Sequence, residues 1–525
     1  MENNKEIETK IEAEIERIRR KYLDSADEIN RDYNEAKALS TDYEGRQIYE
    51  LLQNAQDANA RNSQENLQNL QGTNAKNSQK NAQNSQEINL QISQNKNAQS
   101  AKNSQKANAQ NASSKGFASS KECAEFKGGE VLIEFKNGIL RVSNTGEAFS
   151  LEGFKSLLRP HDSPKTMQQN MIGCKGLGFR SLLSWAQKIT VATKGVALEF
   201  SQSNAREFLQ GLFAQKPQLK NELKKKNADE FPIAVLPCPK IINKEPQNPY
   251  TTSIEIVCKD SICNKVSEQI QALNMLELLF LKDLRRVHII TEAENKSFEK
   301  LQNNENVLII ERDENSQKEN SRTSWRLFEK TGEIEVENDE QNSQNEKLAK
   351  AYEIIIAYDF SHTYDFSENE NFLYSFFKTK TPLNFPALIH CTFELTSERN
   401  SLKSNNAANA ELVGILADFL VEVAVEISNI NKECNYEPLK LILAQEGGLK
   451  EYKFYELLRQ KAKQKPIFPT IANHYISLQD SPKFSTKPFA RVLNPASFSE
   501  LLQVCEDENV KSFLEYNARI SFYDY

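Results

Sequence analysis

The chain has 525 residues, 38 % of them hydrophobic and 26 % charged, with a formal net charge of −7. An ordinary globular protein is about 45–50 % apolar, so polar segments must dilute the core-forming part of this chain. The small excess of 73 acidic over 66 basic residues gives no general attraction to nucleic acid or to an anionic membrane surface. We therefore expect a soluble, cytoplasmic protein of several domains, with no membrane association and no indication of nucleic-acid binding.

The N-terminal region is predicted to be helical. Apolar residues recur at helical spacing within a charged run, namely Ile7, Ile11, Ile15, Ile18 and Tyr22. A second set with the same spacing follows Asp42 and consists of Ile48, Leu51, Leu52 and Ala55. Each set places its apolar side chains on one face, which predicts two amphipathic helices that pack against a core.

Two stretches are too polar to form a core. Residues 59–120 consist mainly of Asn, Gln, Ser, Ala and Lys, with repeats of the triplet Asn-Ser-Gln, and residues 303–347 contain the same triplet. Such segments bury too little apolar area to offset the loss of chain entropy. We expect a disordered low-complexity insertion at 59–120 and an expanded loop or polar linker at 303–347.

Between and after these stretches, strands and helices follow one another without a strict alternation. Apolar patterning predicts strands at 131–135, 139–144, 188–194, from 251 onward, 352–358 and 387–395. Helices are predicted at 151–158, 179–186 and 410–430. Asn137 and Gly138 predict a tight hairpin between the first two strands. The pattern indicates an α+β domain with hairpins rather than a Rossmann or P-loop domain.

The second helix carries a pair of polar side chains suited to metal-assisted hydrolysis. Glu50 and Asn54 lie four residues apart and so share a helix face, and Asp57 and Ala58 follow one turn later. An amide oxygen is a hard ligand for Mg²⁺, and a carboxylate can take a proton from water. The alternative is an ordinary exposed pair on a surface helix.

Two strand ends offer groups that could read a flat base. Asn144 ends one strand and is followed by Thr145 and Gly146, where the absence of a side chain lets a ring approach the backbone. Thr252 lies at the start of a later strand, and its hydroxyl could hold a water beside a base. Either feature alone is also typical of an ordinary turn or strand.

Glycine is scarce, with 17 residues in the chain, yet Gly173, Gly176 and Gly178 lie close together. Closely spaced glycines expose successive backbone N–H groups, and the start of a following helix favours an anionic phosphate. The sequence is not that of a P-loop, because Phe179 and Arg180 follow the last glycine. A structural glycine turn is the alternative.

Taken in order, four segments resemble the nucleotide-binding motifs of the GHKL superfamily of ATPases, most closely the sacsin-like and heat-shock-chaperone-like ATP-binding proteins of bacteria. The segments are ELLQNAQDA, SNTGEAF, IGCKGLGF and TTSIEI. The resemblance implies a Bergerat fold over residues 1–302, which is a two-layer sandwich of a mixed, mostly antiparallel sheet with helices on one face. It further implies an α/β middle domain at 348–430. A mixed helical C-terminal region is expected at 431–525, where the sequence indicates no chemistry, and a homodimer through this region is one expectation.

The resemblance also implies a role for each motif residue. Glu50 would be the general base that activates water, and Asn54 would be the Mg²⁺ ligand. Asn144 would read adenine, with Thr252 assisting through water, and residues 150–171 would form a lid. The other residues implied to contact ATP are Asp57, Ala58, Gly146, Lys165, Gly173, Lys175, Gly176, Leu177, Gly178 and Phe179. The implied cofactors are ATP and Mg²⁺.

A further likeness lies in the segment FPALIHCTFELTSERNSL at 385–402, which resembles the middle domain of the same chaperones. That likeness implies that Arg399 reaches back to the γ-phosphate of ATP and takes part in catalysis. An arginine in a surface ion pair, which contributes little, is the alternative.

The resemblance implies a Mg²⁺-dependent ATPase that couples nucleotide binding and lid closure to a chaperone-like or remodelling action on an unknown client protein. The family usually carries Asp at the position of Asn144 and Gly at that of Ala148. These departures leave open a second function, a nucleotide-binding scaffold that organises a protein interaction without turnover, with a defence-associated role by analogy. A histidine kinase is disfavoured, because no phosphoacceptor helix is recognisable.

Overall fold

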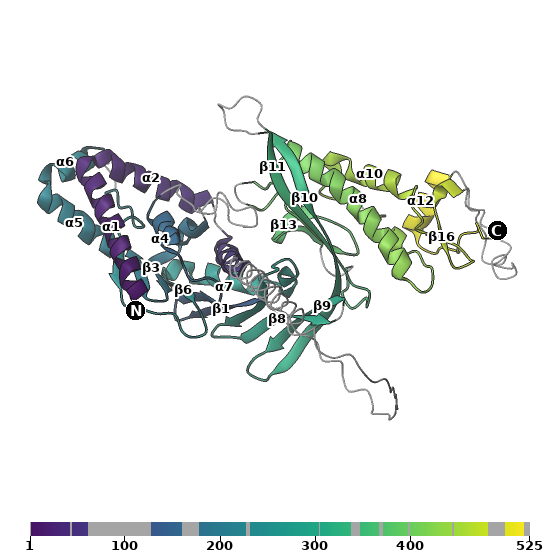
Figure 1. Ribbon diagram of the computed structural model, residues 1–525, viewed down its shortest axis with the longest axis horizontal. Coiled ribbons are helices and arrows are strands. Elements are labelled where there is room, and N and C mark those ends of the chain that lie inside the picture. Colours follow the sequence, from purple (N-terminus) through teal and green to yellow (C-terminus); the bar gives the residue numbers. More distant parts are fainter. Residues whose placement is uncertain are drawn as a thin grey trace, which may run out of the picture.

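The computed structural model describes residues 2–42, 45–60, 128–159, 178–226, 231–303, 305–337, 347–366, 371–396, 399–443, 446–480 and 499–518. Most of the expected insertion, at 61–120, and most of the expected lid, from 160 onward, lie outside these residues. The described chain has an α+β fold in which helices pack on a large, mostly antiparallel sheet, as Figure 1 shows.

Helices lie at both ends of the molecule and also between them, where α7 is labelled (Figure 1). They are α1 (Glu2–Asp24), α2 (Ala26–Asp42), a helix over residues 47–60 that we call the Glu50 helix, α4 (Leu151–Leu158), α5 (Gln202–Gln215), α6 (Pro217–Lys226), α7 (Cys263–Gln271), α8 (Ala407–Ile430), α9 (Glu437–Lys440), α10 (Phe454–Ala462) and α12 (Glu508–Ala518). Short 3₁₀ helices are η2 (Gly178–Ser184), η3 (Asp260–Ile262), η4 (Met275–Leu279), η5 (Lys450–Tyr452) and η6 (Leu478–Asp480).

One 14-stranded sheet connects the two ends, in the order β13-β12-β14-β11-β10-β9-β8-β7-β1-β2-β6-β3-β4-β5. Its strands are β1 (Gly129–Lys136), β2 (Ile139–Asn144), β3 (Ala186–Thr193), β4 (Val196–Ser201), β5 (Lys240–Ile242), β6 (Thr252–Cys258), β7 (Leu284–Ile290), β8 (Asn295–Asn303), β9 (Asn306–Asp313), β10 (Lys318–Glu337), β11 (Lys347–Tyr358), β12 (Phe372–Ser375), β13 (Phe377–Pro382) and β14 (Leu388–Cys391). The pairs β1/β7 and β12/β14 are parallel, and the other pairs are antiparallel. A separate small pair joins β15 (Phe468–Pro469) to β16 (Tyr475–Ile476).

Local sequence signals explain the hairpin and the helix that flank the candidate site. Asn137 and Gly138 have φ angles of 51° and 72°, which suits the two-residue turn of the β1/β2 hairpin, and the prediction of this hairpin is confirmed. Ser150 caps α4 by accepting a hydrogen bond from the Gly153 amide at 3.1 Å. The predicted bounds of that helix are confirmed as well.

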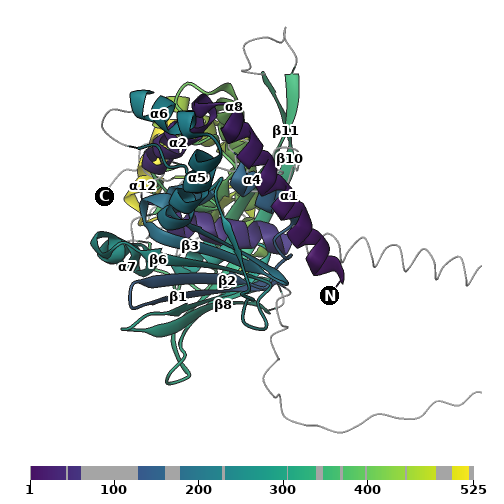
Figure 2. The same ribbon diagram turned by 90° about the vertical axis from the view of Figure 1, so that its left-hand side faces the viewer.

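The half of the sheet that contains β1 to β6, which we call the first half, has helices packed on one face and polar side chains on the other. Leu140 and Val142 of β2 are buried under the helices, whereas Arg141 between them points to the opposite face. There the Arg141 side chain is 2.6 Å from Glu134 and 3.1 Å from Glu255. Figure 2 shows α1, α2 and α5 together on one side of strands β1, β2, β3 and β6. This half is therefore a sheet with helices on one face.

Strand β11, in the half of the sheet that contains β10 to β14, is covered on both faces. In β11, Ile355 and Ala357 face the core of the first half, while Ile354 and Ile356 face a second core that contains α8. This double burial explains why the strand reads as a continuous apolar run rather than an alternating one. Among the described residues, no helix combines the length and the apolar character needed to cross a bilayer.

The expected loop at 303–347 is wrong over most of its length. Residues 306–313 form β9 and residues 318–337 form β10, while 338–346 lie outside the described residues. In β9 the run from Val307 to Ile310 is buried throughout, and in β10 the buried Trp325 lies between Ser324 and Arg326, so short apolar stretches form strands within a polar composition. As a result the sheet runs without a break across the domain boundary expected at 302.

Candidate functional site

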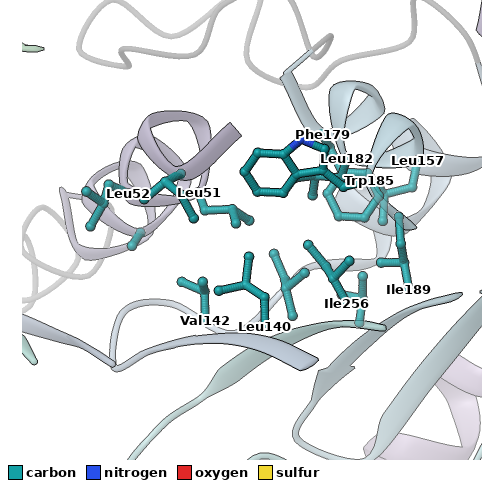
Figure 3. Packing of buried hydrophobic residues seen from close by; sticks show 14 of the residues in the cluster. Leu51, Leu52, Leu140, Val142, Leu157, Phe179, Leu182, Trp185, Ile189 and Ile256 are labelled. Atoms are coloured by element: carbon teal, nitrogen blue, oxygen red, sulfur yellow. The ribbon is translucent and has the colours of Figure 1, made fainter. Parts of the chain in front are cut away.

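The Glu50 helix rests on the sheet by its apolar face. Ile48, Leu51, Leu52 and Ala55 are each at most 2 % exposed, so the predicted amphipathic face is confirmed. Figure 3 shows Leu51 and Leu52 above Leu140 and Val142 of β2. The helix therefore lies across the strand ends that carry the candidate base-reading residues.

Asn144 and Thr252 lie directly opposite each other on the adjacent strands β2 and β6. Strand alternation places both side chains on the helix-covered face, and they are 9 % and 5 % exposed. Within the described part of the chain, neither Asn144 Nδ2 nor Thr252 Oγ1 has a hydrogen-bond partner. We call these the two orphan atoms. Buried polar atoms are nearly always paired, so two neighbouring orphan atoms indicate a place for a ligand or for ordered water.

The loop after β2 is held against the end of the Glu50 helix. The Glu147 amide donates to the Ala58 carbonyl at 2.9 Å, and Thr251 Oγ1 donates to the Gly146 carbonyl at 2.6 Å. A Cβ atom on Gly146 would lie only 2.5 Å from the carbonyl carbon of Ala58. The close approach that Gly146 permits is thus to the helix backbone, whereas the sequence suggested the approach of a ligand ring.

The structure describes only the end of the glycine-rich segment. The helix expected at 179–186 is the 3₁₀ helix η2, which begins at Gly178 and ends at Ser184, because Ala186 already pairs with Cys258 of β6. The ring of Phe179 is 7 % exposed and packs in the core beside Leu182 and Trp185 (Figure 3), so this ring faces apolar side chains. The other predicted phosphate contacts lie outside the described residues, namely Lys165, Gly173, Lys175, Gly176 and Leu177.

Arg399 reaches the Glu50 helix from the second half of the chain. Its Nη1 atom lies 2.6 Å from Gln53 Oε1 and 3.4 Å from Glu50 Oε1. The Arg399 side chain is 19 % exposed and that of Glu50 is 6 % exposed, so this ion pair is largely withdrawn from solvent. The geometry therefore disfavours the alternative of an exposed surface pair. Contact with a γ-phosphate stays a prediction.

Arg46 is a component of the site that the motifs did not indicate. It lies one helical turn before Glu50 and is 6 % exposed. Its Nη1 atom donates to the Arg399 carbonyl at 2.7 Å and to Asn400 Oδ1 at 3.1 Å. The spacing of Arg46 and Glu50 is visible in the sequence, but nothing in the sequence shows that the acceptors lie some 350 residues away.

A buried acid adjoins this cluster. Glu277 in η4 is 4 % exposed, and burial raises its pKa to about 8, although the Tyr49 hydroxyl and the Arg46 charge act in the opposite direction. At neutral pH Glu277 is therefore mostly protonated. Burial likewise lowers the pKa of Arg46, while the Glu50 carboxylate raises it. Glu50 thus faces two guanidinium groups, those of Arg46 and Arg399, and an anionic ligand would improve the balance of charge.

The predicted metal ligand is present on the same helix. Asn54 is half-buried and Asp57 is 1 % exposed, and both already interact with other groups of the protein. The described residues contain no group of three His, Cys, Asp or Glu side chains that could enclose a metal ion. A single amide oxygen suits Mg²⁺ that takes its other ligands from phosphates and water, as is usual in nucleotide sites.

The structure thus brings together two pairs of the predicted residues. Glu50 meets Arg399, and Asn144 meets Thr252, with the Glu50 helix adjoining both pairs. Comparison of the sequence with protein-family models and with curated proteins gives no match. The function has to be argued from this geometry together with the resemblance of the motifs.

Proposed function

We propose that the chain binds ATP with Mg²⁺ between the Glu50 helix and the ends of β2 and β6, in a Bergerat fold, and hydrolyses it. The observation that carries this proposal is the pair of orphan atoms on Asn144 and Thr252. An amide side chain both donates and accepts, so Asn144 can accept from the adenine amino group and donate to a ring nitrogen. Thr252 can hold a water that completes the contact with the base.

The second step of the proposal is hydrolysis. Mg²⁺ would be held by the side-chain oxygen of Asn54 and would supply charge neutralisation at the phosphates. Arg399 is already within 3.4 Å of Glu50, so a phosphate bound near them would compete for its guanidinium group. Release from Arg399 would leave the Glu50 carboxylate available to take a proton from water.

The chaperone-like or remodelling action would follow from the position of Arg399, which lies in the second half of the chain. This residue follows β14 and precedes α8, and both belong to the second core. A nucleotide that attracts Arg399 therefore acts on the second half of the molecule as well as on the first. The client protein would be recognised elsewhere on the chain.

Binding is tested by titration calorimetry with Mg·ATP on the wild type and on Asn144→Ala and Thr252→Val. We expect each substitution to weaken binding by about tenfold, which corresponds to the loss of one buried hydrogen bond. Ser253→Ala is the matched control, because Ser253 lies next to Thr252 on the same strand and donates or accepts only across the other face, with Ser143 at 3.0 Å. Binding that is equal in all four proteins would contradict the proposed site.

The same contact of Glu50 with Arg399 also favours a second function. If Arg399 stays in place, its guanidinium group occupies the Glu50 carboxylate, and the chain would be a nucleotide-binding scaffold. Phosphate release by the wild type and by Glu50→Ala distinguishes the two functions. A rate that falls at least about a hundredfold in the variant indicates an ATPase with Glu50 as base. Tight binding with equal, negligible release indicates a scaffold.

A further inference from the structure

Three side chains at the start of the Glu50 helix hold the chain at Arg399 and Asn400. Arg46 directly precedes the helix, whereas Glu50 and Gln53 lie three residues apart within it and so share a helix face. Arg46 binds the main-chain carbonyl of Arg399, whereas Glu50 and Gln53 contact its guanidinium group. The main chain and the side chain of Arg399 are therefore held by different residues.

The main chain at Arg399 needs such support. Its φ angle is 52°, in the left-handed region, which is unfavourable for a residue with a side chain. The Arg399 amide donates to the Thr396 carbonyl at 2.8 Å, and the Asn400 carbonyl accepts from the Lys380 amide of β13 at 2.7 Å. Two further acceptors in the described part of this turn, the Arg399 carbonyl and Asn400 Oδ1, accept hydrogen bonds from Arg46.

The chemistry of Arg46 suits this task. One planar guanidinium group donates to two acceptors on neighbouring residues, which fixes their orientation as well as their position. Hydrogen bonds from a charged donor are stronger than neutral ones, and this donor is only 6 % exposed. The buried acid Glu277 and the ring of Tyr49, 5.4 Å from the Arg46 guanidinium carbon, form the surroundings that keep the group in place.

We propose that Arg46 is a positioning residue that fastens the Arg399–Asn400 turn to the Glu50 helix. The guanidinium group of Arg399 can then leave Glu50 and bind an anionic ligand, while the Arg46 contact keeps the turn attached to the first half of the molecule. The part of this proposal that concerns turnover rests on the proposed ATPase function. The structural part does not depend on it, because the contacts of Arg46 exist without a nucleotide.

The structural part is tested by hydrogen exchange on the full chain without nucleotide. In Arg46→Gln, we expect the amides of residues 399–403 to exchange at least about tenfold faster than in the wild type, because the charged donor to this turn is lost. Arg141→Gln is the control, since Arg141 also donates to two partners, Glu134 and Glu255, but on the opposite face of the sheet. Asn400→Ala and Arg46→Lys remove part of the contact and should each give a smaller increase if the first variant does not fold.

The part that concerns turnover is tested by steady-state kinetics. Arg46→Gln should lower kcat at least about tenfold with KM changed by less than about threefold, as should Arg399→Gln. The double variant should resemble Arg399→Gln alone, because Arg46 acts through Arg399. The proposal would be overturned if the losses of kcat in the two single variants multiply in the double variant. It would also be overturned if the amides of residues 399–403 exchange equally fast in Arg46→Gln and in the wild type. If the wild type hydrolyses no ATP, the ATPase function fails, and hydrogen exchange alone decides the role of Arg46.

Discussion

Glu277 shows how a single buried group links stability to pH. Burial raises the pKa of this carboxyl from 4.5 to about 8. The folded state therefore holds a proton that the unfolded state has lost between those two values, and stability falls as the pH rises through this window. The charged or titratable groups that face Glu277 are Tyr49, Arg46, Lys378 and Tyr374.

Glu277→Gln should remove this dependence, because the amide resembles the neutral acid. We expect the free energy of unfolding of the wild type to fall, relative to that of the variant, by up to about 1.4 kcal/mol per pH unit within the window. Urea unfolding at pH 5, 6.5 and 8 measures the difference. If the free energies of unfolding of the two proteins change equally with pH, Glu277 is ionised in the folded state and the expectation is wrong.

Gly146 provides a second test at the level of one residue. A methyl group there would meet the backbone of Ala58 and Asn59 at 2.5 and 2.6 Å, so Gly146→Ala must displace either the loop or the helix end. We expect a loss of about 1–3 kcal/mol in the free energy of unfolding. In Gly414→Ala the added methyl meets nothing within 4 Å inside α8, so that control should gain up to about 1 kcal/mol. Equal stability of the two variants would contradict the close approach at Gly146.

At the scale of elements, the N-terminal helix holds α4, which is the first part of the expected lid. Arg159, directly after α4, donates to both oxygens of Glu14 on α1. Glu14 is 8 % exposed and Arg159 is 27 % exposed, so the pair is partly screened by solvent. We expect Glu14→Ala to destabilise the protein by about 1–2 kcal/mol and to speed hydrogen exchange in α4. Glu12→Ala on the exposed side of α1 should change the stability by less than about 0.5 kcal/mol.

The elements that follow local rules were predictable from the sequence. The β1/β2 hairpin follows from Asn137 and Gly138, and α4 follows from its Ser150 cap and its apolar spacing. The strands β9 and β10 were not predictable from composition, because the neighbouring strands supply their stability. The helix expected at 179–186 is present as a 3₁₀ helix, and it ends two residues early because Ala186 pairs with β6.

Some residues of the candidate site could also be predicted from the sequence, whereas others could not. Glu50, Asn144 and Thr252 belong to motifs that are contiguous in the sequence, so their residue types could be recognised. The Bergerat fold itself and the roles of these residues stay predictions. Arg46 could not be found, because its importance depends on the position of the Arg399 turn, which only the tertiary structure reveals.

At the scale of the whole molecule, the continuous sheet and the Arg399 contact connect two cores. If ATP binds as proposed, it should slow hydrogen exchange at the ends of β2 and β6 and also at residues 399–403, because Arg399 would contact the nucleotide. Arg399→Gln should keep the first effect and lose the second. Protection confined to the first half in the wild type would contradict a connection through Arg399.

The central claim is that a nucleotide lies between the Glu50 helix and the ends of β2 and β6. A crystal structure of the full chain with Mg²⁺ and a non-hydrolysable ATP analogue tests this most directly. We expect an adenine ring hydrogen-bonded to Asn144 Nδ2, with Thr252 Oγ1 beside it and the γ-phosphate in contact with Arg399. A nucleotide bound elsewhere, or a complex in which both orphan atoms remain without partners, would contradict the account.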